Sequence, residues 1–95
     1  MRRESYDIGI KLSNGTNFSD IITPGAYYSE NSTVTNTMNN VPMTGSDFRL
    51  VVERITSSTY MQRFYKPTVN NYFCMRTYTA GAWLSWCKFE GTVLT

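Results

Sequence analysis

The chemistry open to this 95-residue chain is limited by one absence, because the sequence contains no histidine. Without histidine, a Ser-His or Cys-His catalytic pair is excluded, as is any zinc site that uses an imidazole. Its two cysteines are also too few for an all-cysteine zinc site. The sequence therefore predicts no metal and no cofactor, and it predicts no catalytic residues built on histidine.

The acidic residues are the remaining candidates for acid–base chemistry. A glycosidase needs two carboxyl groups facing each other across a cleft. No two acidic residues here fall at a spacing that predicts such a pair, and a chain of this length leaves little room for a deep cleft. We therefore expect a protein that is not an enzyme. The carboxylates considered are Asp20, Glu30, Asp47, Glu53 and Glu90.

Aromatic and hydrogen-bonding residues in the second half offer a different chemistry, the binding of sugars. Tyr60, Tyr78 and Trp83 could form a stacking platform, because an aromatic face offers contact area with little loss of conformational entropy. Gln62 and Arg76 could hydrogen-bond sugar hydroxyls, and Arg76 could also bind an acidic sugar or a phosphate. Ordinary cross-strand packing or a subunit interface explains the same residues. Both interpretations stay open at this stage.

Charge gives little indication of a nucleic-acid or membrane partner. The nine basic and seven acidic residues leave a net charge of +2, without the clustered basic stripe typical of nucleic-acid binders. The apolar residues are too broken up for a membrane span. We therefore expect neither nucleic acid nor membrane insertion.

Strands must position the candidate residues. Thr, Ser and Asn are abundant, and these residue types suit strands and turns better than helix interiors. From Asp47 onward, the pattern predicts an antiparallel meander of about four strands with connections of hairpin length. The predicted fold class is therefore mainly β, in a small single domain. The expected strands span residues 47–55, 60–66, 72–79 and 82–90.

The faces of this meander follow if its last turn centres on Ala80-Gly81. One face is expected to form the core and carries Leu50, Val52, Met61, Tyr65, Phe73, Met75, Leu84 and Trp86. The other face is expected to be covered by the first half of the chain or to bind a ligand. Its cross-strand rows are Tyr60/Tyr78/Trp83, Gln62/Arg76/Ser85 and Phe64/Cys74/Cys87.

The two cysteines face one another in this register. Directly opposed strand positions give a strained disulfide at best. We therefore expect Cys74 and Cys87 to be reduced and partly buried.

The first half of the chain is dominated by turn chemistry. Residues 8–12 alternate between apolar and other side chains, which predicts a short, half-buried N-terminal strand ended by Asn14-Gly15. Asn17 can then cap a single short helical turn near residues 17–22. Residues 29–47 have the composition of a long polar loop.

Several short motifs then occur in a fixed order along the chain. They are Asn17-Phe18-Ser19, Thr23-Pro24-Gly25 with Tyr27-Tyr28, Asn40-Val41-Pro42, Gln62 with Tyr65, Arg76-Thr77, and Trp83 with Trp86. The series resembles the pyocin knob domain of phage and phage-like tail fibres, including those of R-type pyocins. It departs from that pattern at Asn17 and Ser19, at Leu84-Ser85 and at Cys87.

The resemblance covers residues 14–90, and it implies a knob-like domain there. Residues 1–13 are then a lead-in strand and residues 91–95 a C-terminal tail. In this interpretation the motif residues form the fold, and Gln62 and Arg76 satisfy one another or nearby backbone.

What the resemblance implies for function is a module of a phage or prophage tail fibre. Such a module belongs to a homotrimer in the virion, is made in the host cytoplasm, and contributes to attachment to the bacterial host, with a surface glycan as candidate ligand. Two alternatives stay open. One is a carbohydrate-binding accessory domain of an enzyme that degrades cell walls or capsules, and the other is a purely structural fibre spacer.

Overall fold

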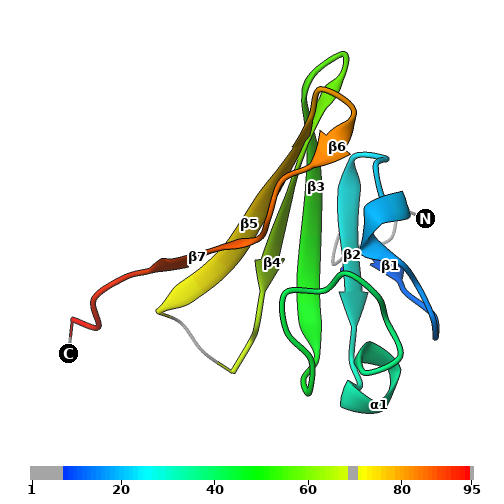
Figure 1. Ribbon diagram of the computed structural model, residues 1–95. Coiled ribbons are helices and arrows are strands. Elements are labelled where there is room, and N and C mark those ends of the chain that lie inside the picture. Colours follow the sequence, from blue (N-terminus) through cyan, green and yellow to red (C-terminus); the bar gives the residue numbers. More distant parts are fainter. Residues whose placement is uncertain (1–7, 69–70, 95) are drawn as a thin grey trace, which may run out of the picture.

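Residues 8–68 and 71–94 are described by the computed structural model. These residues form one twisted sheet with two helical turns packed against it (Figure 1). The order in the sheet is β1-β2-β3-β4-β5, and both β6 and β7 pair with β5. Along the chain the elements are β1 (Ile10–Lys11), the 3-10 turn η1 (Phe18–Asp20), β2 (Gly25–Ser29), α1 (Ser32–Thr35), β3 (Phe48–Thr56), β4 (Thr59–Tyr65), β5 (Tyr72–Thr79), β6 (Ala82–Trp83) and β7 (Cys87–Glu90).

The predicted mainly-β fold and the meander of its second half are confirmed, with two differences in the strands. The last expected strand is broken, because residues 84–86 separate β6 from β7. Within residues 8–13 of the expected N-terminal strand, Ile10 and Lys11 form β1, which pairs in parallel with β2. Residues 1–7 of that predicted strand lie outside the described residues. Ile8 and Ile10 are exposed, so the prediction of a half-buried strand there is wrong. Only Leu12 packs against the core.

The predicted register of the β4–β5 hairpin is confirmed. Tyr60 pairs with Tyr78, and Gln62 pairs with Arg76. The turn that follows β5 is also where the sequence places it. Ala80 and Gly81 have φ angles of 53° and 83°, and two positive values in succession give the tight turn whose twist matches that of antiparallel strands.

The prediction of which face forms the core is wrong. We call the buried side of the sheet the inner face and the other side the outer face. A β-bulge between Arg54 and Thr56 shifts the β3–β4 pairing by one residue, so that Leu50 lies opposite Phe64. The predicted core residues Leu50, Val52 and Trp86 pack on the inner side, but Leu84 is exposed, and Met61, Tyr65, Phe73 and Met75 point outward. The buried residues of β3, β4 and β5 are Phe48, Leu50, Val52, Gln62, Phe64, Cys74 and Arg76.

The first half of the chain covers the inner face, as one of the two expectations for that surface had it. Phe18 is fully buried, and its ring lies 5.3 Å from that of Phe48. Asn17 caps η1 as predicted, because the Ser19 N–H donates to Asn17 Oδ1 over 2.9 Å. A hydrophobic anchor and a capped turn therefore hold this layer on the sheet.

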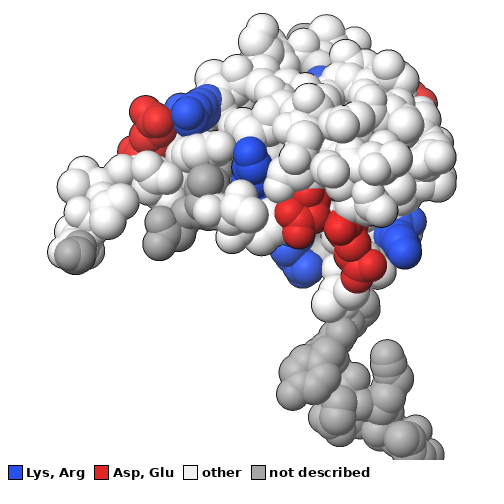
Figure 2. All heavy atoms as spheres, turned by 90° about the horizontal axis from the view of Figure 1, so that it is seen from below, with Lys and Arg blue, Asp and Glu red and all other residues white. Residues whose placement is uncertain are grey.

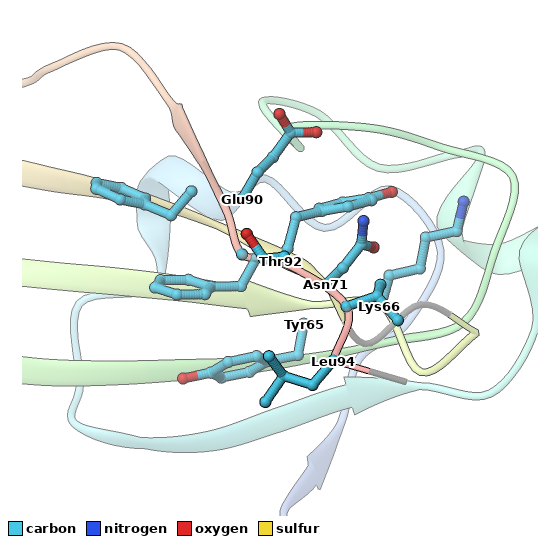
Figure 3. A pocket seen from close by; sticks show the side chains of 11 residues that line it. Tyr65, Lys66, Asn71, Glu90, Thr92 and Leu94 are labelled. Atoms are coloured by element: carbon cyan, nitrogen blue, oxygen red, sulfur yellow. The ribbon is translucent and has the colours of Figure 1, made fainter.

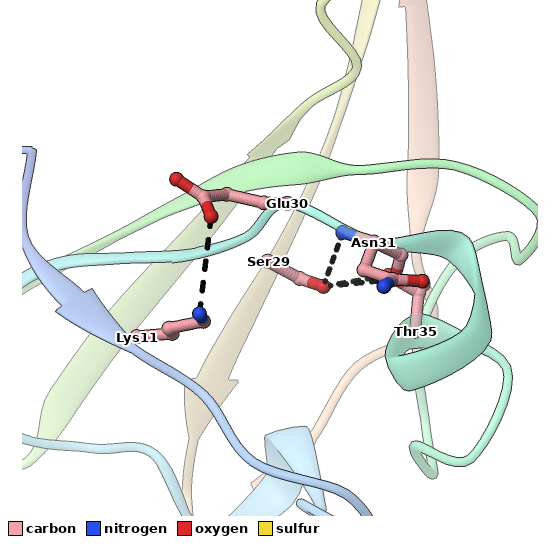
Figure 4. A network of polar contacts seen from close by, with 5 residues as sticks. All are labelled: Lys11, Ser29, Glu30, Asn31 and Thr35. Atoms are coloured by element: carbon pink, nitrogen blue, oxygen red, sulfur yellow. Dashed lines mark hydrogen bonds and ion pairs between the residues drawn. The ribbon is translucent and has the colours of Figure 1, made fainter.

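The polar loop contains a helical turn that the sequence analysis did not identify. Asn31 caps α1 by accepting a hydrogen bond from the Thr33 N–H over 2.7 Å. The Thr35 hydroxyl donates to Ser29 Oγ over 3.0 Å, so two buried hydroxyls join the turn to the end of β2 (Figure 4). Short hydroxyl side chains can therefore be buried here, because each finds a partner nearby.

Charges on the surface are mixed. The view in Figure 2 shows acidic and basic side chains near one another on a mostly uncharged surface. No helix in the described part of the chain is long and apolar enough to cross a membrane.

Candidate functional site

The structure brings the five predicted binding residues together on the inner face. Trp83 of β6 pairs with Tyr78 of β5, which in turn pairs with Tyr60 of β4. The next inward row along the same strands is Gln62 and Arg76. Ser85, expected in that row, lies in the break between β6 and β7. The set is therefore one cluster, and its members differ sharply in burial.

Gln62 and Arg76 lie inside the protein. Their exposed fractions are 0% and 6%. The Arg76 Nε–H donates to Gln62 Oε1 over 2.8 Å. Gln62 Nε2 then donates to the carbonyl oxygens of Phe18 and Ile21 over 2.7 and 3.0 Å. These contacts satisfy both ends of the amide and join the sheet to η1, which favours a structural interpretation of the pair.

The Arg76 guanidinium is held between two tryptophans. Its central carbon lies 4.1 Å from the centroid of the Trp83 ring and 4.7 Å from that of Trp86. No carboxylate in the described residues forms an ion pair with it. Burial lowers the pKa of Arg76 to about 10, so the group stays charged at neutral pH. Two aromatic faces and a neutral amide therefore stabilise a buried cation.

Both indoles also bond to the covering layer. The Trp83 N–H donates to the carbonyl of Ser19 over 3.1 Å, and the Trp86 N–H donates to that of Asn40 over 2.9 Å. Sequence reasoning missed the part played by Trp86, because residues 83 and 86 of one continuous strand lie on opposite faces. Because residues 84–86 interrupt the strand between β6 and β7, the rings of Trp83 and Trp86 both reach Arg76. The only sequence signal for it is Leu84-Ser85, where the expected motif differs.

The solvent-accessible part of the cluster is the edge of the inner face at Tyr60 and Tyr78, beside Trp83, which we call the rim. Tyr60 and Tyr78 are partly exposed, with ring centroids 5.7 Å apart. They border a depression of about 570 Å³ whose polar groups include Ser19, Asp20 and Ser57. Aromatic rings beside hydroxyls and one carboxylate can contact and hydrogen-bond a sugar. Within the described chain, no three acidic or cysteine side chains gather where they could hold a metal.

The two cysteines are free thiols, as expected, but two predictions about them are wrong: they do not face one another, and Cys87 is exposed rather than partly buried. In the β5–β7 pairing, Cys74 lies opposite Lys88, and Cys87 lies opposite Met75. The register is shifted by one residue because the chain between β6 and β7 leaves the sheet. Cys74 is buried on the inner face and Cys87 is exposed on the outer face. Burial raises the pKa of the Cys74 thiol, and the charge of Lys88 partly offsets this.

Comparison with known proteins gives a clear result for the fold. No family model matches the chain. A search of curated proteins finds no match. Solved structures of R-type pyocin tail fibres, by contrast, superpose on nearly the whole chain.

Three of these structures illustrate the likeness. An N-truncated R2-type pyocin tail fibre gives a TM-score of 0.79 at 17% identity over 93% of the chain. C-terminal fragments of the R1 and R2 pyocin fibres of P. aeruginosa give TM-scores of 0.77 and 0.79, at 21% and 18% identity, each over 90% of the chain. The chain spans 34%, 22% and 23% of those fibre chains. It therefore has the fold of one segment of such a fibre, as the resemblance implied.

Proposed function

We propose that this chain is a non-enzymatic module of a phage or prophage tail fibre that contributes to attachment of the virion to its bacterial host. The observation that carries the proposal is the likeness in fold to pyocin tail fibres over at least 90% of the chain. The ordered motifs that carry the resemblance in sequence support it independently. In the assembled fibre the chain belongs to a homotrimer, located in the virion tail.

A role without catalysis agrees with how the acidic residues are used. Glu53 pairs with Arg63 at 3.0 Å, Glu30 with Lys11 at 3.8 Å, and Glu90 with Lys88 at 3.3 Å. The depression beside Tyr60 and Tyr78 contains a single carboxylate, that of Asp20. Hydrolysis of a glycosidic bond requires two.

The ligand that fits the rim is a bacterial surface glycan. We assign the direct contacts to Tyr60 and Tyr78, with Trp83 beside them. The Tyr78 and Trp83 rings meet edge to face at 5.3 Å, which holds the Tyr78 ring at the mouth of the depression. Gln62 and Arg76 act from behind by fixing the strands.

Location in the virion is the first test. Antibodies raised against the chain and coupled to gold should label the tail fibres of particles released by the organism that encodes it. Labelling of another part of the particle, or of none, would contradict the proposal. Slower adsorption of those particles in the presence of the free chain would support a role in attachment. Labelled fibres with unchanged adsorption would point to a spacer.

Binding at the rim is tested with cell-wall glycans of the same host. Tyr78→Asp should abolish their retention by the immobilised chain, because the ring supplies contact area that a carboxylate lacks. Leu84→Asp is the matched control, since Leu84 is exposed and does not line the depression. Equal retention by both variants would contradict the glycan assignment. A parent polypeptide that also carries a hydrolase domain would instead favour the accessory-domain alternative.

A further inference from the structure

The turn at Asn14-Gly15 lies between β1 and η1 and contains the only asparagine in the sequence that is followed by glycine. The Thr16 N–H donates to the carbonyl of Ser13 over 3.3 Å, which closes the turn. Gly15 has a φ of 78°, and a positive φ at the third residue of a β-turn favours glycine. Both Asn14 and Gly15 are exposed to solvent.

An asparagine followed by glycine can lose its side-chain amide without an enzyme. The backbone nitrogen of the glycine gives up its proton to hydroxide and attacks the side-chain carbonyl carbon of the asparagine. The new N–C bond closes a succinimide ring, the bond from that carbon to the amide nitrogen breaks, and ammonia leaves with a proton taken from water. Water then opens the ring at either carbonyl and gives aspartate or isoaspartate. Glycine permits the attack best, because it has no β-carbon beside the attacking nitrogen.

The surroundings of this turn leave the two reacting groups accessible. A β-carbon placed on Gly15 would meet no atom within 4 Å. Among the described residues, none forms a hydrogen bond with the Asn14 side chain that would hold its amide in place. Water and hydroxide therefore reach both the Asn14 side chain and the Gly15 backbone, because neither is covered by the rest of the fold.

One hydrogen bond opposes the reaction, because it holds the proton that must leave. The Gly15 N–H donates to Thr37 Oγ1 over 2.8 Å. The Thr37 hydroxyl in turn donates to the carbonyl of Val34 over 2.7 Å, so the acceptor is fixed to α1. A backbone N–H in such a bond gives up its proton only when the bond opens. Thr37 is exposed and does not line the depression beside the rim.

We propose that Asn14 is a site of spontaneous deamidation, and that the Thr37 hydroxyl sets the rate of this modification in the folded chain. The reactants are the Asn14 carboxamide and water, and the products are ammonia and an aspartate or isoaspartate at position 14. Isoaspartate takes the main chain through the former side-chain carbon, which lengthens it between β1 and η1. This chemistry is the same whether or not the chain belongs to a tail fibre.

The test is incubation of the full 95-residue chain in mildly alkaline buffer, with mass spectrometry of peptide fragments over time. Asn14 should acquire the mass of a carboxylate in place of an amide. Asn71 is the internal control, because it is partly exposed in the groove beside β7 but is followed by Tyr72 (Figure 3). Asn71 should stay intact while Asn14 is converted. Conversion of Asn71 at the same rate as Asn14 would overturn the proposal.

Two substitutions of Thr37 test the role of its hydroxyl. Thr37→Val keeps the shape of the side chain but removes the acceptor, so Asn14 should be converted roughly fivefold faster, as expected for the loss of one hydrogen bond. Thr37→Ser keeps the hydroxyl and should match the wild type.

Hydrogen exchange separates this effect from a general loss of stability. Exchange of the Gly15 amide should speed up in Thr37→Val, while the amides of β3 should exchange as in the wild type. Equal conversion of Asn14 in the wild type and both variants would overturn the role of Thr37, as would faster conversion in Thr37→Ser. An Asn14 that stays intact even in Thr37→Val would overturn the modification site itself.

Discussion

The inner and outer faces of the sheet both carry aromatic rings, but they differ in how polar groups are used. On the inner face, Gln62 and Arg76 are buried at the centre and hydrogen-bond to each other, and Gln62 also bonds to two carbonyls of the covering layer. On the outer face the corresponding positions are Met61 and Met75, and the rings there stack on one another. The closed face of this sheet therefore combines apolar side chains with two buried polar ones that have hydrogen-bond partners, whereas the open face carries partly exposed apolar side chains beside the Arg63–Glu53 ion pair.

The physical reason is the cost of an unpaired polar group. A carbonyl or guanidinium buried without a partner costs more than the net gain of an ordinary hydrogen bond. The carbonyls of Phe18 and Ile21 need the amide of Gln62, so η1 can pack in only one position on the sheet. Apolar contacts on the outer face set no such condition, because they have no required direction.

The largest difference in stability between the two faces is expected for single substitutions at two neighbouring residues of β4. Gln62→Met removes three hydrogen bonds and leaves two buried carbonyls without a donor. We therefore expect a loss of about 3–5 kcal/mol in the free energy of unfolding. Met61→Gln places an amide on the partly exposed outer face and should change it by about 0.5–1 kcal/mol. Urea unfolding of both variants measures the difference. Equal losses would mean that the two faces are equivalent.

Removal of one phenyl ring from each face should give the next largest difference. Phe64 is buried among inner-face rings, with its centroid 5.0 Å from that of Phe48, and Phe64→Ala should cost about 3–4 kcal/mol. Phe73→Ala on the outer face should cost about 1 kcal/mol in the monomer, since its site is partly open to water. Denaturant titrations at low protein concentration check both values. A larger cost for Phe73→Ala would place the core on the outer face.

The two tryptophans should separate by a smaller margin. Trp86 contacts the rings of Phe18 and Phe64 as well as Arg76, so Trp86→Ala should cost about 3 kcal/mol and yield poorly soluble protein. Trp83 lies at the rim, and Trp83→Ala should stay folded with a loss of about 2 kcal/mol. Thermal melts followed by circular dichroism rank the two. A folded Trp86→Ala beside an unfolded Trp83→Ala would reverse the assignment.

The smallest effect concerns the two cysteines, whose labelling rates should differ between the two faces without a change in stability. Cys87 should react promptly with a thiol reagent in the native monomer because it is exposed. Cys74 should react at least about a hundredfold more slowly than Cys87, because burial limits access of the reagent. Burial also raises the pKa of the Cys74 thiol, which lowers its thiolate fraction at pH 8. Mass spectrometry of the labelled chain identifies the site. Rapid labelling of Cys74 would show that the inner face opens readily.

The sequence by itself determined the local features of this protein, because each depends on residues close together in the chain. The Asn17 cap, the Ala80-Gly81 turn and the β4–β5 register were all predictable. A cap and a tight turn involve adjacent residues, and a connection of hairpin length limits how two neighbouring strands can pair. The ordered motifs also indicated the fold that comparison with the pyocin fibres supports.

Only the tertiary structure decided which face is buried. Both faces of the sheet carry apolar and polar residues, so the periodicity of the sequence did not show which face is buried. The bulge near Arg54 and the break between β6 and β7 at residues 84–86 each shifted a strand register by one residue. Glutamine and arginine are usually exposed, so the sequence alone suggests that Gln62 and Arg76 belong to a surface binding site. They are buried because carbonyls of a distant 3-10 turn and the rings of Trp83 and Trp86 complete their hydrogen bonds and solvate their charge. Partners of that kind come together only when the whole chain has folded.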